Sequence, residues 1–240
     1  MTNYPTNNNQ TPPPKYLTDL IHAFEENANA ENAVQMEKYM RNKFEFYGIK
    51  SPGRKEIYKV FKKNAGLIPA GSQEEIVRWC WNADQREYQM FAMEFLGRTT
   101  KKENEDIIHL YEFLITTKSW WDTVDFIASN LVGVYFSRYP SRIPQITNRW
   151  MEFGNIWLQR TCLLFQLKYK SNLNMELLDS FIQPLLPSKE FFIQKAIGWI
   201  LREYSKTNPE LVISYVENNS LSNLSNREAL LWINKKRIIT

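Results

Sequence analysis

Glycine and histidine are both scarce in this sequence of 240 residues, and each shortage argues against a class of site. The eight glycines do not fall in the spacing of a dinucleotide-binding or P-loop fingerprint, so the sequence disfavours nucleotide cofactors. The two histidines, His22 and His109, occupy apolar helical stretches, and the two cysteines are far apart, which argues against a usual zinc site. We therefore expect neither a metal ion nor a cofactor.

Cysteines and long apolar runs are also few. Cys80 and Cys162 each lie within an apolar helical stretch, so we interpret both as reduced core residues, which are typical of a reducing compartment. No run approaches the roughly 18 apolar residues of a membrane span, and the first residues lack the apolar core of a signal peptide. These features predict a cytoplasmic protein that does not bind membranes.

Apolar and aromatic side chains are plentiful by contrast, at 43% and 14% of the residues, enough to bury a substantial core. The formal net charge of +4 is mildly basic, which suits a polyanionic partner without requiring one. Residues 1–15 are rich in asparagine and proline and predict a disordered tail. Because no second linker follows, we expect one folded domain over residues 16–240.

Helix signals recur throughout the predicted domain. Alternating strand patterns with hairpin turns are essentially missing, so the sequence predicts an all-α fold. Helix starts are marked by polar N-cap residues, by acids three residues later and by proline in a first turn. The expected starts are at two capping-box pairs, Ser72 with Glu75 and Asp84 with Glu87, at Ser119 and Ser188, and at Pro52.

A glutamine recurs in three of the predicted helices. Gln89, Gln159 and Gln194 each follow an aromatic or apolar residue, and their separations are multiples of 35. A period of this length lies in the range of helix-pair repeats such as HEAT and its relatives. Steps of 35 residues from Gln89 also reach position 124, where Val124 stands in place of a glutamine. The residues that follow these positions are expected to be equivalent and, in a solenoid, to line one continuous surface.

In three successive repeats, the residue that directly follows the position of the glutamine or of Val124 is charged. The residues are Asp125, Arg160 and Lys195. Trp121 lies four residues before Asp125 and Trp199 lies four after Lys195, so each tryptophan shares a helix face with a charge. A surface that mixes cations with exposed aromatic rings is typical of nucleic-acid binding. The alternative is that these are solvated polar positions of helices whose other faces are buried.

Several long segments of the chain match the pattern of a known family. They are residues 39–42 (YMRN), 46–49 (FYGI), 117–125 (TKSWWDTVD), 155–160 (NIWLQR), 188–199 (SKEFFIQKAIGW) and 201–209 (LREYSKTNP). Together they resemble the AlkD family of DNA alkylation repair glycosylases over nearly everything after the tail. Nearly contiguous matches of this length are far more specific than a short motif.

The resemblance implies both a fold and an activity. The implied fold is a C-shaped solenoid of HEAT-like repeats, a monomer whose concave face holds duplex DNA. The implied reaction is hydrolysis of the N-glycosidic bond of purines made cationic by alkylation, such as 3-methyladenine and 7-methylguanine, without extrusion of the base into a pocket. Because no lysine nucleophile stands at the matched site, the resemblance implies a monofunctional glycosylase that leaves an abasic site.

The resemblance also assigns roles to individual residues. The family's catalytic aspartate matches Asp125, and its two site tryptophans match Trp121 and Trp199. Its site arginine, which is expected to hold a backbone phosphate near the lesion, matches Arg160. The residues expected to contact DNA are Arg160, Tyr39 and Lys195.

Several points stay open at the level of sequence. Asp125 either stabilises the oxocarbenium-like sugar that forms as the bond breaks or also orients the attacking water. Lys50 stands where close relatives have a DNA-contacting glutamine, which puts that contact in doubt, and Trp157 fits either packing or the site. The rival to an enzyme is a noncatalytic HEAT-like module that binds DNA or protein.

Overall fold

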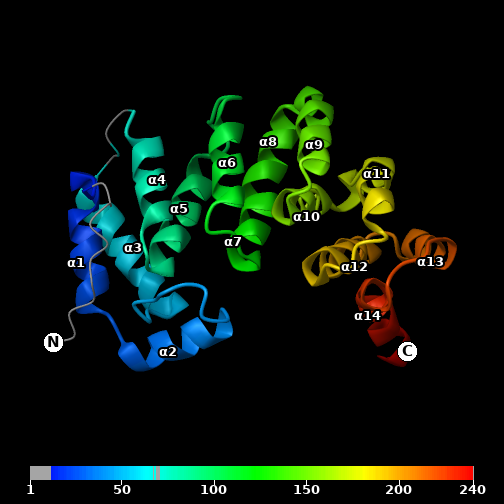
Figure 1. Cartoon of the computed structure of the whole chain (residues 1–240), viewed down its shortest axis with the longest axis horizontal. Coiled ribbons are helices and arrows are strands. Elements are labelled where there is room, and N and C mark those ends of the chain that lie inside the picture. Colours follow the sequence, from blue (N-terminus) through cyan, green and yellow to red (C-terminus); the bar gives the residue numbers. More distant parts are fainter. Residues whose placement is uncertain (1–11, 67, 69–70, 240) are drawn as a thin grey trace. The chain divides into compact units, whose positions relative to one another are not determined.

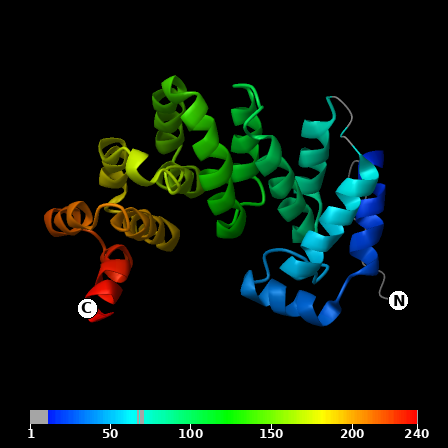
Figure 2. The same ribbon diagram turned by 180° about the vertical axis from the view of Figure 1, so that it is seen from behind.

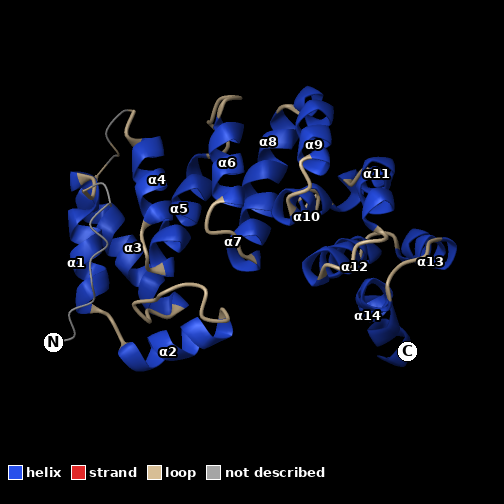
Figure 3. Ribbon diagram, in the orientation of Figure 1, coloured by secondary structure: helices blue, strands red, loops and turns tan. Residues whose placement is uncertain are grey.

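The computed structural model describes residues 12–66, 68 and 71–239, and every regular element in these ranges is a helix (Figure 3). The expected all-α fold is therefore confirmed. Residues 1–11 of the expected tail lie outside the described ranges, and the first 3₁₀ helix, η1, spans Lys15–Leu17. Contacts divide the chain into two compact units, Met1–Leu96 and Gly97–Thr240. The single domain expected over residues 16–240 stays a prediction.

The first unit consists of helices (Figure 1), and aromatic side chains form part of its core. Its helices are α1 (Thr18–Glu26), α2 (Ala30–Tyr39), α3 (Ser51–Ala65), α4 (Gln73–Asn82) and most of α5 (Arg86–Thr99). The ring of Phe24 on α1 lies 5.3 Å from that of Tyr88 on α5, measured between centroids in an edge-on arrangement. Tyr58 on α3 packs in the same way against Phe91, at 5.2 Å. Edge-to-face pairs of this kind add to the stabilisation that burial provides.

The second unit contains the remaining helices, which follow one another in sequence order in Figures 1 and 2. They are α6 (Ile107–Thr116), α7 (Trp121–Phe126), the π-helix η2 (Ile127–Val132), α8 (Gly133–Arg138), η3 (Pro140–Arg142), α9 (Ile143–Glu152), α10 (Ile156–Leu164), η4 (Lys170–Asn172), α11 (Met175–Leu185), α12 (Phe191–Ser205), α13 (Pro209–Asn218) and α14 (Asn223–Ile239). Helix α10 contacts α6, α7, η2, α9, α11 and α12. It is accordingly buried on most of its surface.

The recurring glutamines have one structural role in common. The side-chain amide of Gln89 donates to three carbonyl oxygens at the end of α4, at 2.9–3.1 Å. Gln159 donates to the carbonyl of Met151 in the last turn of α9, at 3.4 Å. Gln194 donates to the carbonyl of Ser188, just after α11, at 3.0 Å. The last carbonyls of a helix have no partner within it, and Gln89 and Gln159 bind carbonyls at such ends. Gln194 instead binds the segment that follows α11, so each glutamine ties its helix to the end of the preceding helix or to the residues just after it.

The expected capping boxes are wrong, although Pro52 lies in the first turn of α3 as predicted. Helix α4 does begin directly after Ser72, as predicted, but Ser72 has a helical backbone conformation instead of the usual extended one and makes no side-chain cap hydrogen bond. Helix α5 begins at Arg86, so Asp84 is not its N-cap. The buried carboxylate of Glu87 accepts three successive backbone N–H groups in the loop before α3. This acid therefore anchors a distant loop instead of its own helix.

The two expected serine caps are also wrong. The hydroxyl of Ser119 donates back to the carbonyl of Ile115 at 2.6 Å, and Trp120 is the N-cap of α7. Ser188 accepts the N–H of Glu190, which is the N-cap of α12. Asparagines perform this function, because their side-chain oxygens accept first-turn N–H groups as well as serine does. The capping asparagines are Asn29 of α2, Asn155 of α10, Asn174 of α11 and Asn208 of α13.

Both cysteines are free and buried, as the sequence predicts. Burial raises the pKa of the Cys80 and Cys162 thiols far above the ordinary range, so neither is a reactive thiolate at neutral pH. Among the described residues, no helix combines the length and the apolar character that crossing a membrane requires.

The helix that carries Asp125 changes its pitch two residues after it. Helix α7 ends at Phe126, η2 continues with π geometry, and α8 begins at Gly133. Segments of π-helix are rare and are often found at functional sites. A Cβ added at Gly133 would lie 2.4 Å from the carbonyl oxygen of Phe165, which follows α10. Gly133 therefore sets how closely the segment α7–η2–α8 approaches the end of α10.

We expect the substitution Gly133→Ala to lower the free energy of unfolding by about 1–3 kcal/mol, because overpacking against a backbone carbonyl forces the helices apart. The control is Gly53→Ala in α3, where the added Cβ would lie 3.5 Å from Cγ2 of Ile49, an ordinary contact. Alanine is the better helix former, so the control is expected to be neutral or slightly stabilising. Urea denaturation measures both, and equal stabilities of the two variants would contradict the close approach.

Candidate functional site

The centre of the candidate site is an ion pair between Asp125 on α7 and Arg160 on α10. The guanidinium makes two hydrogen bonds to the carboxylate, from Nε to Oδ1 at 2.7 Å and from Nη2 to Oδ2 at 2.8 Å. The Arg160 side chain is 4% exposed and that of Asp125 is 15% exposed. The two residues are 35 positions apart, so equivalent positions of successive repeats are in direct contact. The register predicted a shared surface, and the structure adds that the two charges pair.

Arg160 is also held by a third helix. Its Nη1 donates to the backbone carbonyl of Phe192 at the start of α12. A guanidinium has five N–H donors, and Asp125 and Phe192 accept from three of them. Two donors remain on a side chain that is almost fully enclosed. The expected contact between Arg160 and a DNA phosphate would use these two donors, and it stays a prediction.

The electrostatic state of Asp125 reflects opposing influences. Burial is the largest and raises the pKa of the carboxyl group, while the hydrogen bonds and the positive charge of Arg160 lower the pKa and the nearby Asp122 raises it. The net result is a pKa above the ordinary aspartate value. Because an arginine stays protonated in proteins, the bidentate geometry favours the ionised carboxylate at neutral pH. The site thus holds a carboxylate, paired with a guanidinium, in a position that water screens poorly.

The two expected site tryptophans are half-buried and lie on the helices that hold Arg160. Trp121 is the first residue of α7, one turn before Asp125 and on the same stripe of the helix. Trp199 lies on α12, seven residues after Phe192, so the two share a face about two turns apart. Helix α7 supplies the carboxylate for Arg160, and α12 supplies the carbonyl. The contacts of either indole with a ligand stay predictions.

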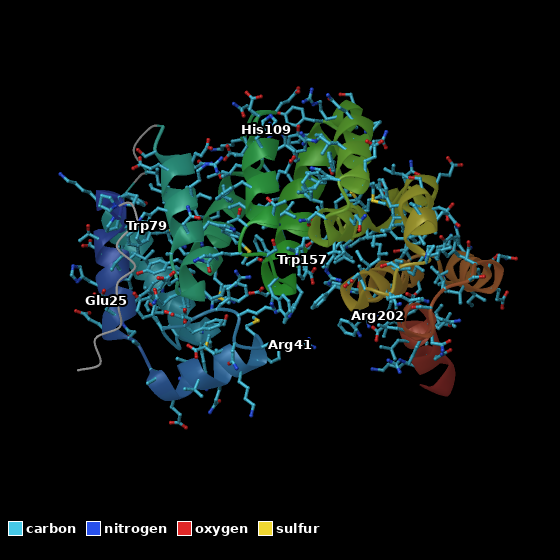
Figure 4. The ribbon with its side chains drawn as sticks, viewed as in Figure 1. Glu25, Arg41, Trp79, His109, Trp157 and Arg202 are labelled. Carbon is cyan, nitrogen blue, oxygen red and sulfur yellow. The ribbon has the colours of Figure 1, made fainter. Side chains whose placement is uncertain are left out.

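An aromatic cluster that the sequence did not reveal lies beside the ion pair. The rings of Trp120, Trp157 and Phe192 pack against one another with centroids 5.0–5.8 Å apart. The guanidinium carbon of Arg160 lies 5.9 Å from the ring centroid of Phe192. Trp157, on α10 (Figure 4), therefore belongs to this cluster. The sequence contains one signal for this cluster, because Trp157 and Phe192 are separated by 35 residues, the same period as the glutamines.

The other residues expected to contact DNA have different surroundings. Lys195 on α12 donates to the buried carboxylate of Glu228 on α14, with Nζ 2.6 Å from Oε1, so its charge is paired. Tyr39 is the last residue of α2 in the first unit, and it is 70% exposed. Neither observation tests a DNA contact, and both contacts stay predictions.

The geometry suits a ligand that carries or develops a positive charge. A carboxylate fixed by two hydrogen bonds stabilises a nearby cation without having to reorient. Electron-rich aromatic faces also attract cations. Among the described residues, no group of three or more histidine, cysteine, aspartate or glutamate side chains is placed to hold a metal ion.

Comparisons with known proteins apply to most of the chain. The sequence model of a family described as DNA alkylation repair enzyme matches residues 20–233. A solved structure from Enterococcus faecalis, described as a predicted DNA alkylation repair enzyme, is 32% identical, with a TM-score of 0.79 over 87% of this chain and 97% of that chain. The structure of smu.31 from Streptococcus mutans UA159 shares the fold at 16% identity, with a TM-score of 0.54 over 84% of this chain and 96% of that chain. No curated protein matched.

Proposed function

Because this chain belongs to the DNA alkylation repair enzyme family, we propose that it is a DNA glycosylase acting on cationic alkylated purines in duplex DNA. The proposed substrates are 3-methyladenine and 7-methylguanine, and the bond hydrolysed is the N-glycosidic bond. The observation that carries the proposal is the bidentate pair of Asp125 and Arg160, which fixes a largely buried carboxylate beside a cluster of aromatic rings.

The chemistry requires little proton transfer. A purine alkylated at N3 or N7 is already cationic, so it takes the bonding electron pair and leaves as a neutral base. The enzyme must still stabilise the positive charge that develops on the deoxyribose, as in glycoside hydrolysis. We propose that Asp125 meets this demand electrostatically and that it holds the sugar cation, with or without orienting the attacking water.

We propose that the reaction is monofunctional. Water adds to C1′ of the sugar and releases a proton, which leaves an abasic site in an uncut strand. Strand cleavage would require a lysine amine to form a Schiff base with the sugar. Lys195, the lysine in the same repeat register, donates to Glu228. We further propose that a monomer binds the duplex and that the lesion stays within it instead of being extruded.

A panel of alkylated DNA substrates tests this function against its rival, a noncatalytic helical-repeat module. The native chain is incubated with methylated duplex DNA, and the released bases are identified by mass. We expect 3-methyladenine and 7-methylguanine to appear faster than they do in buffer alone. Release at the spontaneous rate, under conditions where the duplex is bound, would favour the noncatalytic module.

We expect Trp199→Leu to slow the release of 7-methylguanine by roughly 2- to 30-fold. The reason is that a cation–π contact contributes about 0.5–2 kcal/mol, and a factor of ten in rate corresponds to about 1.4 kcal/mol. The control is Trp79→Leu, which removes a half-buried tryptophan from the first unit. Single-turnover rates of both variants make the comparison, and an unchanged rate for Trp199→Leu would contradict the contact.

A further inference from the structure

Three residues on α12 form a single stripe, and the first and last of them bind α14. Lys195, Trp199 and Arg202 are spaced four and three residues apart, so they lie one above another on the helix. Nζ of Lys195 lies 2.6 Å from Oε1 of Glu228, and Nη1 of Arg202 lies 2.7 Å from Oε2 of the same carboxylate. Arg202 is labelled on α12 in Figure 4. Trp199 therefore stands between two cations that are both anchored on one residue of α14.

The two helices also approach each other closely at this point. A Cβ added at Gly198 would lie 2.5 Å from Cβ of Glu228 and 2.7 Å from the carbonyl oxygen of Ser225. The hydroxyl of Ser225 donates to the carbonyl of Gln194 at 2.8 Å. Helix α14 lies beside α12 in both Figures 1 and 2. Glu228 is thus packed against the backbone directly before Trp199.

The surroundings of Glu228 favour the ionised form of its carboxyl group. Its side chain is only 10% exposed, and burial by itself raises the pKa. The hydrogen bond and charge of Lys195, together with the charges of Arg202 and Arg227, outweigh this effect and lower the pKa below the ordinary glutamate value. The carboxylate is therefore ionised at neutral pH. Its single negative charge offsets part of the positive charge of Lys195 and Arg202.

We propose that Glu228 is a positioning residue for the site, because it fixes the rotation of α12 through Lys195 and Arg202 and so holds Trp199 in place. The ligand of Trp199, a cationic alkylated purine, rests on the proposed function. Glu228 also removes net positive charge from the surroundings of the indole. Two unpaired cations at this place would oppose the binding of a cationic base.

The substitution Glu228→Gln tests the role of this charge, because it keeps the shape packed against Gly198. We expect the single-turnover rate of 7-methylguanine release to fall about tenfold, which corresponds to a modest loss of transition-state binding. Duplex binding is expected to stay at least as tight, with a salt slope steeper by about one or two, because Lys195 and Arg202 are freed for phosphates. The matched control is Glu217→Gln on α13, which replaces an exposed acid.

A loss of packing alone would weaken binding and slow release together, so tighter or equal binding with slower release separates the two causes. Equal release rates for Glu228→Gln and Glu217→Gln would overturn the proposal. A second measurement does not depend on catalysis. The fluorescence of Trp199 is obtained as the difference between each chain and its Trp199→Phe counterpart, with and without acrylamide.

In the Glu228→Gln background we expect the Trp199 emission to shift and to be quenched more strongly by acrylamide, because the indole is less firmly held. An unchanged difference spectrum would overturn the positioning role even in an active enzyme. If the native chain releases no base, the proposed function fails, while the fluorescence still decides whether Glu228 positions Trp199.

Discussion

Replacement of Asp125 by asparagine is expected to slow 7-methylguanine release by about 100-fold or more, while binding of the same duplex persists. The amide keeps the size of the carboxylate and one oxygen that accepts from Arg160, but it carries no charge. Removing one electrostatic group from a transition state typically costs a factor of about 10² to 10³ in rate. Single-turnover release and equilibrium binding of one labelled duplex, measured side by side, provide the comparison.

The control for this substitution is Asp122→Asn, on the same helix. Asp122 raises the pKa of Asp125, so removing its charge is expected to leave the carboxylate of Asp125 more readily ionised. We expect the rate of this variant to stay close to that of the native chain. Normal excision by Asp125→Asn would show that the catalytic assignment is wrong.

The substitution Arg160→Ala is expected to reduce stability more than any other change at the site. It leaves the carboxylate of Asp125 buried without its partner, and breaking a buried ion pair in this way costs about 3–5 kcal/mol. We also expect release to slow, because the carboxylate loses the two hydrogen bonds that orient it. Urea denaturation measures the first effect, with Arg149→Ala as control. Arg149 pairs with Glu112 at a more exposed place, where the loss is expected to be about 1 kcal/mol or less.

The pH dependence of release separates the loss of orientation from a simple loss of folded protein. Only the ionised form of Asp125 stabilises a sugar cation, so release by the native chain is expected to fall as the pH drops through the raised pKa of this residue. Arg160 lowers that pKa, and its removal therefore raises it further. The acid limb of the rate profile is expected to move to higher pH in Arg160→Ala. An acid limb that stays in place would contradict the electrostatic coupling of the two residues.

The same variant addresses the phosphate contact expected for Arg160. If the two remaining donors bind a phosphate, the slope of log affinity against log salt becomes shallower by about 0.9 in Arg160→Ala. An unchanged slope would count against the phosphate contact and would limit Arg160 to its role beside Asp125.

The fold could be predicted from the sequence because its repeats follow a physical need. Carbonyls at or just beyond a helix end require a donor, and Gln89, Gln159 and Gln194 supply one at separations that are multiples of 35 residues. The exact helix starts were less predictable. Serine and asparagine cap helices about equally well, so a single sequence does not show which of them is used. Glu87 was misassigned because its position suggested a local cap, whereas burial directs its carboxylate to another loop.

The candidate site was only partly predictable for a similar reason. The register placed Asp125 and Arg160 on one surface, but it carries no information about side-chain direction and therefore did not predict the pair. Lys195 was expected on that surface as a DNA contact, and its partner Glu228 was not foreseen. Glu228 follows Lys195 by 33 residues, outside the period of the glutamines. Contacts of this kind depend on how closely neighbouring helices approach, which the sequence pattern alone does not specify.

Product analysis on a duplex that contains one 7-methylguanine decides whether the chain is a monofunctional glycosylase. The native chain is used in excess over the duplex, so that all of the DNA is bound. We expect free 7-methylguanine to accumulate well above the spontaneous rate, the strand to stay intact until alkali cleaves it at the abasic site, and borohydride to trap no covalent complex. Fully bound duplex that loses its base no faster than free duplex would contradict a catalytic role for Asp125 and for the chain as a whole.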